Sequence, residues 1–198
     1  ADRIYQVGLH KKIGTQDERS ASTCPPLAEA MTTEIPEVEA SLRLHPWSKA
    51  NLHYGEQELS VDKVFFTESN FFDFFSFKLI SGNPRTALKE PNTVVLTERI
   101  ASRLFGDENP LEKLIVIDGG EKVTYKVTGV TEDCPGNSHF RFNVLLSGGA
   151  DSYLKVNAWL NSGVFTYFLL AKNAAVSEVE KKMENLVASY VAPALQDF

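Results

Sequence analysis

The sequence predicts a mixed α+β fold, and three observations carry that prediction. Residues 3–44 read as strand, helix and strand. Residues 164–191 read as a strand followed by an amphipathic helix. Between them, most apolar segments alternate with a period of two residues, which is typical of strands. Periodicity by itself supports only the mixed α+β class, which is compatible with one βαβ/βα lobe formed by both chain ends (1–52 and 158–198) and an inserted β-rich lobe (53–157).

The first lobe begins with an alternating strand over 3–10, followed by a polar stretch, 11–23, that we interpret as a loop. A helix follows two prolines and has one apolar face, with Leu27 and the positions three, four and eight residues later. Pro36 ends this helix. Alternation over 38–44 predicts a second strand.

The inserted segment begins with residues 45–58, which read either as a loop or as a hairpin turning at 54–56. A strand is expected over 59–66, with Leu59, Val61 and Phe65 on one side. A short helix over 70–77 follows, and Ser81-Gly82-Asn83-Pro84 predicts a turn.

Residues 92–96, Asn-Thr-Val-Val-Leu, follow a proline and predict the start of a buried strand. Thr97 is placed to cap the next helix by accepting a backbone N–H. Gly106 is placed to end that helix. The buried face of this helix consists of Ile100, Ala101, Leu104 and Phe105.

The rest of the insert reads as a hairpin over 114–130 and a strand over 140–144. In the C-terminal helix, Ser177 and Glu180 have the spacing of a capping box. We expect Pro193 to end that helix.

Phenylalanines concentrate in one part of the chain: eight of the 13 lie between Val64 and Val116. Packing in the core is the favoured interpretation, because aromatic side chains are mostly buried. Exposed aromatic patches also mark interfaces, so one face of the cluster is a candidate partner- or lipid-facing surface. The candidate partner-facing residues are Phe71, Phe72, Phe74 and Phe75.

Asp133, Cys134 and His139 are near one another in sequence and suggest either a Cys/His nucleophile pair or a metal site. Metal sites need three or four ligands at regular spacing, which the other histidines do not supply. We therefore favour a turn whose polar side chains bond to the backbone. No catalytic, cofactor-binding or metal-binding residue is assigned.

Two acidic pairs, Glu56/Glu58 and Asp107/Glu108, lie in turn-like segments and are interpreted as solvated charges. The sequence contains no glycine-rich nucleotide-binding motif and no zinc-protease or nucleophile-elbow motif. We therefore expect no enzymatic activity and no ATP site in this chain.

The formal charge of −6 argues against binding to nucleic acid or to anionic lipid. No apolar run approaches the roughly 20 residues that cross a bilayer, and no signal peptide opens the chain. Because the first residue is not methionine, we interpret the sequence as an excised or processed piece.

An ordered set of motifs resembles the MacB-like periplasmic core domain, the extracytoplasmic part of FtsX-like permeases of ABC transporters. The set runs over most of the chain, and its order, not any single piece, is specific. Around Lys113 the family usually has a Gly preceding a Lys, whereas this chain has Leu-Glu-Lys, which leaves the conformation of that turn open. The matching segments are Arg3–Val7, Ile35–Glu39, the phenylalanine-rich segment 65–82, Pro91–Gly106 with Asn109–Leu111, Tyr125–Val130 and Pro135–Phe140.

The resemblance implies the two-lobed arrangement: a porter-like lobe built from both ends (1–52 and 158–198) and an inserted, β-rich lobe called the sabre (53–157). It implies a location on the periplasmic side of the bacterial inner membrane, anchored by membrane helices outside this chain. It also implies partners: a cytoplasmic ATPase subunit or domain, a second permease copy, and a periplasmic adaptor or other extracytoplasmic protein. An oxidising compartment would permit a disulfide between Cys24 and Cys134, although two unpaired cysteines are the favoured interpretation.

The function we expect is a non-catalytic extracytoplasmic domain that couples cytoplasmic ATP hydrolysis to conformational work outside the membrane. One alternative is a secreted module that binds a peptide or lipid without a transporter. Membrane segments on both sides of this sequence in the full reading frame would favour the transporter. A second alternative is an enzyme that uses Cys134 and His139, which loss of a hydrolytic activity in Cys134→Ala would support.

Overall fold

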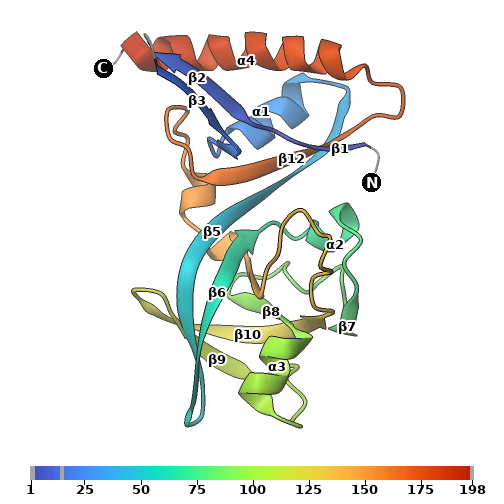
Figure 1. Ribbon diagram of the computed structural model, residues 1–198, viewed down its shortest axis with the longest axis vertical. Coiled ribbons are helices and arrows are strands. Elements are labelled where there is room, and N and C mark those ends of the chain that lie inside the picture. Colours follow the sequence, from blue (N-terminus) through green and yellow to red (C-terminus); the bar gives the residue numbers. More distant parts are fainter. Residues whose placement is uncertain (1–2, 14–15, 197–198) are drawn as a thin grey trace. The chain divides into compact units, whose positions relative to one another are not determined.

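The chain folds into two compact units, each with its own apolar core. The computed structural model describes residues 3–13 and 16–196. Unit 1 consists of residues 1–45 and 152–198, and unit 2 of residues 46–151. The long strand β5 (Val38–Tyr54) begins in unit 1 and ends in unit 2 (Figure 1).

Unit 1 contains a small antiparallel sheet with β12 at its centre. β1 and the first part of β5 pair with opposite edges of β12, so they run parallel to each other with β12 between them. Strands from both ends of the sequence therefore share this sheet. The elements of unit 1 besides β5 are β1 (Ile4–Gln6), β2 (Leu9–Ile13), β3 (Gln16–Ser20), β4 (Ser22–Thr23), α1 (Leu27–Glu34), the 3-10 turn η2 (Tyr153–Lys155), β12 (Val164–Leu170) and α4 (Val176–Gln196).

The core of unit 1 joins α1, β12 and α4. Met31 of α1 is 1 % exposed, and it belongs to the same cluster as Phe168 of β12 and Val179 of α4. Leu27, Met31 and Ile35 are buried as the spacing predicted, whereas Ala30 is only half-buried and Ala28, outside the predicted face, is buried. An amphipathic helix stabilises a fold mainly by burying such a face.

Residues 11–23 are not the loop that the sequence predicted. The described part of this segment forms the β2–β3 hairpin, in which Leu9 pairs with Ser20 and His10 with Arg19. The Nε2 atom of His10 lies 2.8 Å from Oδ1 of Asp17. The hairpin has few apolar residues, so the alternation by which strands are predicted is missing.

Helix α4 confirms the predicted amphipathic helix but differs from the prediction at both ends. It begins at Val176, so Ser177 lies in the first turn instead of at the cap. It also continues past Pro193 to Gln196. A proline inside a helix removes one backbone hydrogen-bond donor. Pro193 lies in the last turns of this 21-residue helix, so the lost hydrogen bond affects only its end.

In unit 2, strand pairing closes on itself to form a small barrel. β5, β6, β11, β8, β10 and β9 pair in that order, and β9 pairs back to β5 through Asn51 and Asp118. The 45–58 stretch is therefore the hairpin alternative, with Gly55 at φ 57° in its turn. The further elements are β6 (Gln57–Thr67), α2 (Phe71–Phe74), β7 (Leu79–Gly82), β8 (Thr93–Thr97), α3 (Glu98–Phe105), β9 (Leu114–Asp118), β10 (Lys122–Thr131), β11 (Val144–Ser147) and the 3-10 turn η1 (Gly148–Ala150).

The interior of the barrel is apolar, and α3 packs against β6, β8 and β10. Every residue of β8 is buried. β10 and β11 pair with its two edges, Val94 and Leu96 belong to the apolar core, and α3 packs against the strand. The predicted buried face of α3 is confirmed, and Gly106 ends the helix with φ 61°. Thr97 stands at the N-cap, but its side chain makes no capping hydrogen bond, so that detail of the prediction is wrong.

Strand β6 is interrupted at Lys63, which has φ 55°. Leu59 and Val61 face the core as predicted, but Asp62 and Lys63 are both exposed, and Val64 is the next buried residue. An extra residue of this kind is a β-bulge, and it moves the following side chains to the other face. Phe65 is therefore only half-buried, contrary to the prediction.

Three further segments of unit 2 differ from the prediction. The helix predicted over 70–77 is only α2, and the turn predicted at 81–84 overlaps β7, which pairs with the edge of β10. The strand predicted over 140–144 begins only at Val144. Phe140 and Phe142 instead pack their rings against Phe71, which fixes an irregular backbone there.

The turn at Glu112, which the sequence left open, has a left-handed backbone with φ 66°. Such a conformation costs a non-glycine residue about 1–2 kcal/mol. We expect Glu112→Gly to raise the free energy of unfolding by about 0.5–1 kcal/mol in urea denaturation, after the extra chain entropy of glycine is subtracted. Glu112→Ala also removes the exposed ion pair with Lys126 but keeps the strain, so it should bring no gain; equal stability of both variants would contradict the prediction.

Candidate functional site

Seven phenylalanines of unit 2 form one contiguous cluster around Phe71, which has no exposed surface. They are Phe71, Phe72, Phe74, Phe75, Phe77, Phe140 and Phe142. The ring centroid of Phe71 lies 5.3 Å from that of Phe75, 5.7 Å from Phe77 and 5.5 Å from Phe142. Most of these pairs meet edge to face, a geometry that adds to the free energy gained by burial. The cluster is therefore a packed core that joins α2 to the segment before β11.

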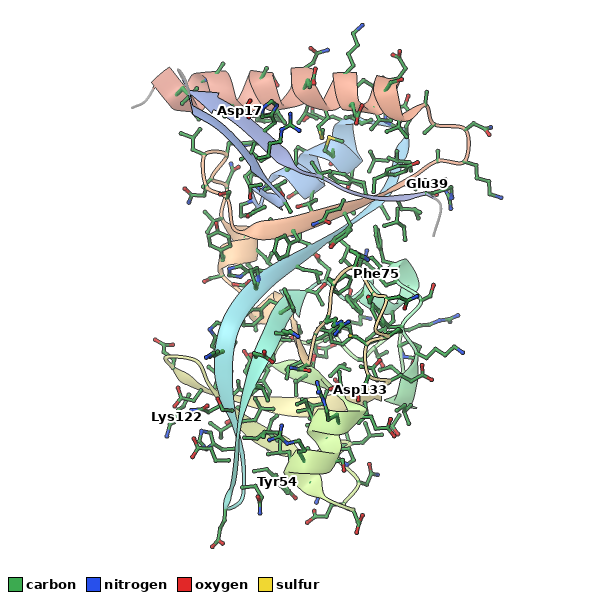
Figure 2. The ribbon with its side chains drawn as sticks, viewed as in Figure 1. Asp17, Glu39, Tyr54, Phe75, Lys122 and Asp133 are labelled. Carbon is green, nitrogen blue, oxygen red and sulfur yellow. The ribbon has the colours of Figure 1, made fainter. Side chains whose placement is uncertain are left out.

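The candidate partner-facing residues differ strongly in exposure. Phe71 is 0 % exposed, and Phe74 and Phe75 are each 8 % exposed. Phe72 alone among the four is partly exposed. Figure 2 shows Phe75 beside α2. The core interpretation thus fits Phe71, Phe74 and Phe75. Phe72 is the one of the four candidates with a partly exposed side chain that a partner could contact.

Cys134 and His139 have different neighbours. The Cys134 thiol exchanges two hydrogen bonds with the backbone of Phe142, both with a distance of 3.4 Å. The ring of His139 packs against Phe140 at 4.8 Å and against Phe75 at 6.2 Å. Within residues 3–13 and 16–196, no group of three metal-binding side chains occurs.

Burial raises the pKa of the Cys134 thiol above its ordinary value of 9.0, and it does the same for Cys24. Both cysteines are free. A raised pKa leaves little thiolate at neutral pH, and the thiolate is the nucleophile. The environment of Cys134 therefore disfavours nucleophilic chemistry.

We expect this to be measurable as slow modification of Cys134 by a thiol reagent at pH 7.5, several times slower than in the same chain unfolded in urea. The rate in the folded protein should rise as the pH passes 9, because the thiolate forms only there. Cys24→Ser isolates the signal of Cys134. Faster modification in the folded chain than in the unfolded chain would reinstate an activated nucleophile.

The acidic pairs do not form a carboxylate dyad. Glu56 and Glu58 are exposed beside the β5–β6 turn. Glu108 accepts hydrogen bonds from Lys113 at 3.1 Å and from the Tyr54 hydroxyl at 3.0 Å. The Lys113 contact, then the Tyr54 contact, lower the pKa of Glu108. A general acid needs the opposite shift.

Unit 1 carries a groove of about 650 Å³ that the sequence did not indicate. Trp159 and Tyr190 stack at its rim, with ring centroids 4.3 Å apart and an interplanar angle of 8°. The hydroxyl of Tyr190 donates to Glu34 of α1, and Arg43 donates to two backbone carbonyls. No periodic signal in the sequence singles out Trp159, which lies in a turn.

In the part of the chain that the structure describes, no helix is long and apolar enough to cross a membrane. The observations together describe a mixed α/β fold with two apolar cores and polar grooves, and no metal-binding cluster is found among the described residues.

The sequence matches the model of one protein family over residues 1–186; the family is described as the MacB-like periplasmic core domain. A comparison with curated protein sequences finds no match. The chain belongs to the family of MacB-like periplasmic core domains, which confirms the resemblance drawn from the ordered motifs.

Solved structures agree on the fold. A crystal structure described as a domain of a permease protein from Porphyromonas gingivalis has a TM-score of 0.79 at 23 % identity, covering 96 % of this chain and 81 % of that one. The periplasmic region of MacB from Actinobacillus actinomycetemcomitans has a TM-score of 0.67 at 17 % identity, covering 94 % and 83 %. The extracellular domain of the ABC-type transporter YknZ from Gram-positive bacteria has a TM-score of 0.62 at 14 % identity, covering 86 % and 85 %.

Proposed function

We propose that this chain is the non-catalytic periplasmic domain of an ABC transporter permease, anchored at the inner membrane of a bacterium by helices outside the chain. The family match over residues 1–186 carries the proposal. In this proposal ATP is hydrolysed by a cytoplasmic subunit or domain, and the membrane helices pass the motion to this domain. Its work is the export of a substrate or the activation of an extracytoplasmic partner.

The arrangement of the chain supports such a role. β1 and α4, the first and last described elements, both belong to unit 1, so both attachments would act on the same compact body. A packed lobe can move as a rigid body about short connections. We propose that unit 1 is the porter-like lobe and unit 2 the sabre-like lobe.

The test uses the full-length permease with its ATPase, reconstituted in lipid, and spin labels on a permease dimer. Glu121→Cys, exposed at the β9–β10 turn, carries the label in a Cys24→Ser, Cys134→Ser background. We expect the label-to-label distance distribution to change between the nucleotide-free state and the ATP-bound state of a hydrolysis-deficient ATPase. Permease without the ATPase serves as the control and should not respond to ATP.

Two outcomes would contradict the proposal. One is an identical distance distribution in every nucleotide state. The other is recovery of the full-length protein from the soluble periplasmic fraction, which would favour the secreted binding module instead.

A further inference from the structure

A polar cavity of about 270 Å³ lies on the surface of unit 2, where the bulge of β6, the first turn of α3 and the segment before β11 meet. Figure 2 shows Asp133, one of its lining residues, beside α3. The side chains that give the cavity its chemistry are Lys63, Arg99, Arg141, Asp133, Cys134 and Asn143.

Three separate features of the fold bring the cations together. The bulge of β6 makes Lys63 exposed where strict alternation would bury it. Arg99, in the first turn of α3, donates from Nη2 to Oδ1 of Asn143 at 2.8 Å. Asn143 is 7 % exposed and is itself held by Asp62 at 2.7 Å. Arg141 donates to a backbone carbonyl, that of Gly136.

In the part of the chain that the structure describes, the side chains of Arg99 and Arg141 donate only to neutral groups. Among the described residues, no carboxylate lies within ion-pair distance of Lys63, Arg99 or Arg141. Among the described residues that line the cavity, Asp133 has the one carboxylate, and its Oδ1 accepts the backbone N–H of Arg99 at 3.4 Å. A guanidinium has five N–H donors, so both arginines keep donors for a ligand.

We propose that this cavity binds a phosphate group, either as free phosphate or as part of a small phosphate monoester. Three cations and one carboxylate leave two positive charges, which match the roughly −1.5 to −2 of a phosphate monoester at neutral pH. Arginine forks fit phosphate oxygens with paired hydrogen bonds. The cavity is a locally positive site that attracts anions, although the net charge of the whole chain is −6.

The proposal is tested on the 198-residue chain by NMR titration of backbone amides with inorganic phosphate, glycerol 3-phosphate and acetate at constant ionic strength. We expect saturable shifts at Arg99, Cys134 and Asn143 with both phosphates, and weaker ones with acetate. Arg99→Gln and Arg141→Gln should each raise the dissociation constant about tenfold or more, as for loss of a charged hydrogen bond. Arg85→Gln, an exposed arginine of unit 2 outside the cavity, should leave it unchanged.

The amide spectra also report whether each variant is folded, and Lys63→Gln provides a third variant if one arginine is needed for stability. Tighter binding of glycerol 3-phosphate than of phosphate would identify an organic phosphate as the ligand, whereas equal affinity would identify the free ion. Unsaturable shifts, or equal weakening by Arg85→Gln, would overturn the proposal.

Discussion

Replacing Phe71 with alanine is expected to lower the free energy of unfolding of unit 2 by about 3–5 kcal/mol. Phe71 is fully buried, and its ring contacts those of Phe72, Phe75, Phe77, Phe140 and Phe142. Truncation removes the buried ring and leaves a cavity lined by rigid aromatic groups, which cannot easily collapse.

The measurement is urea denaturation followed by the fluorescence of Trp47, which packs 5.4 Å from Phe66 in unit 2. A Trp159→Phe background removes the signal of unit 1. Phe72→Ala is the matched control, because Phe72 is partly exposed; we expect it to cost about 1 kcal/mol or less. Similar costs for both variants would mean that Phe71 is not the centre of the cluster.

The same pair of variants bears on the candidate partner surface. Phe72→Ala should preserve the fold, so a loss of binding to an extracytoplasmic partner in that variant would identify a contact residue. Phe71→Ala cannot distinguish a contact residue from a structural one. Its loss disturbs the packed core, and a packed core transmits that disturbance to the neighbouring surface.

The second large effect is expected at Gly82, at the end of β7. This glycine has φ 99°, and a Cβ atom there would lie 2.3 Å from the carbonyl oxygen of Thr128 and 2.9 Å from Cα of Gly129. Both atoms are backbone of β10, the strand with which β7 pairs. Backbone strain and overpacking together lead us to expect that Gly82→Ala costs about 3 kcal/mol or more.

Substitutions at two other glycines separate the cost of backbone strain from the cost of steric overlap in the same urea assay. Gly136→Ala meets no atom within 4 Å and has no positive φ, so its effect should stay within about 0.5 kcal/mol. Gly55→Ala keeps the positive φ without a steric contact and should cost about 1 kcal/mol. Gly82→Ala as stable as Gly136→Ala would show that β7 does not pack against β10 as described.

Local patterns predicted the elements that bury one regular face. The helix α3 follows from its apolar spacing, and Gly106 ends it as expected. The β9–β10 hairpin and β12 follow from alternation and length. These features depend on residues close in sequence, and burial then favours the same conformation that local propensity does.

The sequence did not predict the elements in which local propensity and burial do not favour the same conformation. The polar β2–β3 hairpin has no apolar face to detect, and Phe140 and Phe142 alternate like a strand although their rings fill the cluster around Phe71. The bulge at Lys63 shifts the faces of β6 without any glycine to signal it.

The candidate sites also divide into those that the local sequence indicates and those that only the folded chain assembles. The sequence indicated the phenylalanine cluster and the family, because both rest on residue types in a fixed order. The groove at Trp159 and Tyr190 and the cavity at Lys63, Arg99 and Arg141 gather residues that are far apart in the chain.

By itself, the sequence determined the family of this protein, its helices with one apolar face and its phenylalanine-rich core, because these depend on composition and short-range spacing. Only the tertiary structure decided which phenylalanines are buried, how the strands of unit 2 close into a barrel, and where cations meet. Those outcomes depend on long-range pairing and on single backbone irregularities, which leave no periodic trace in the chain.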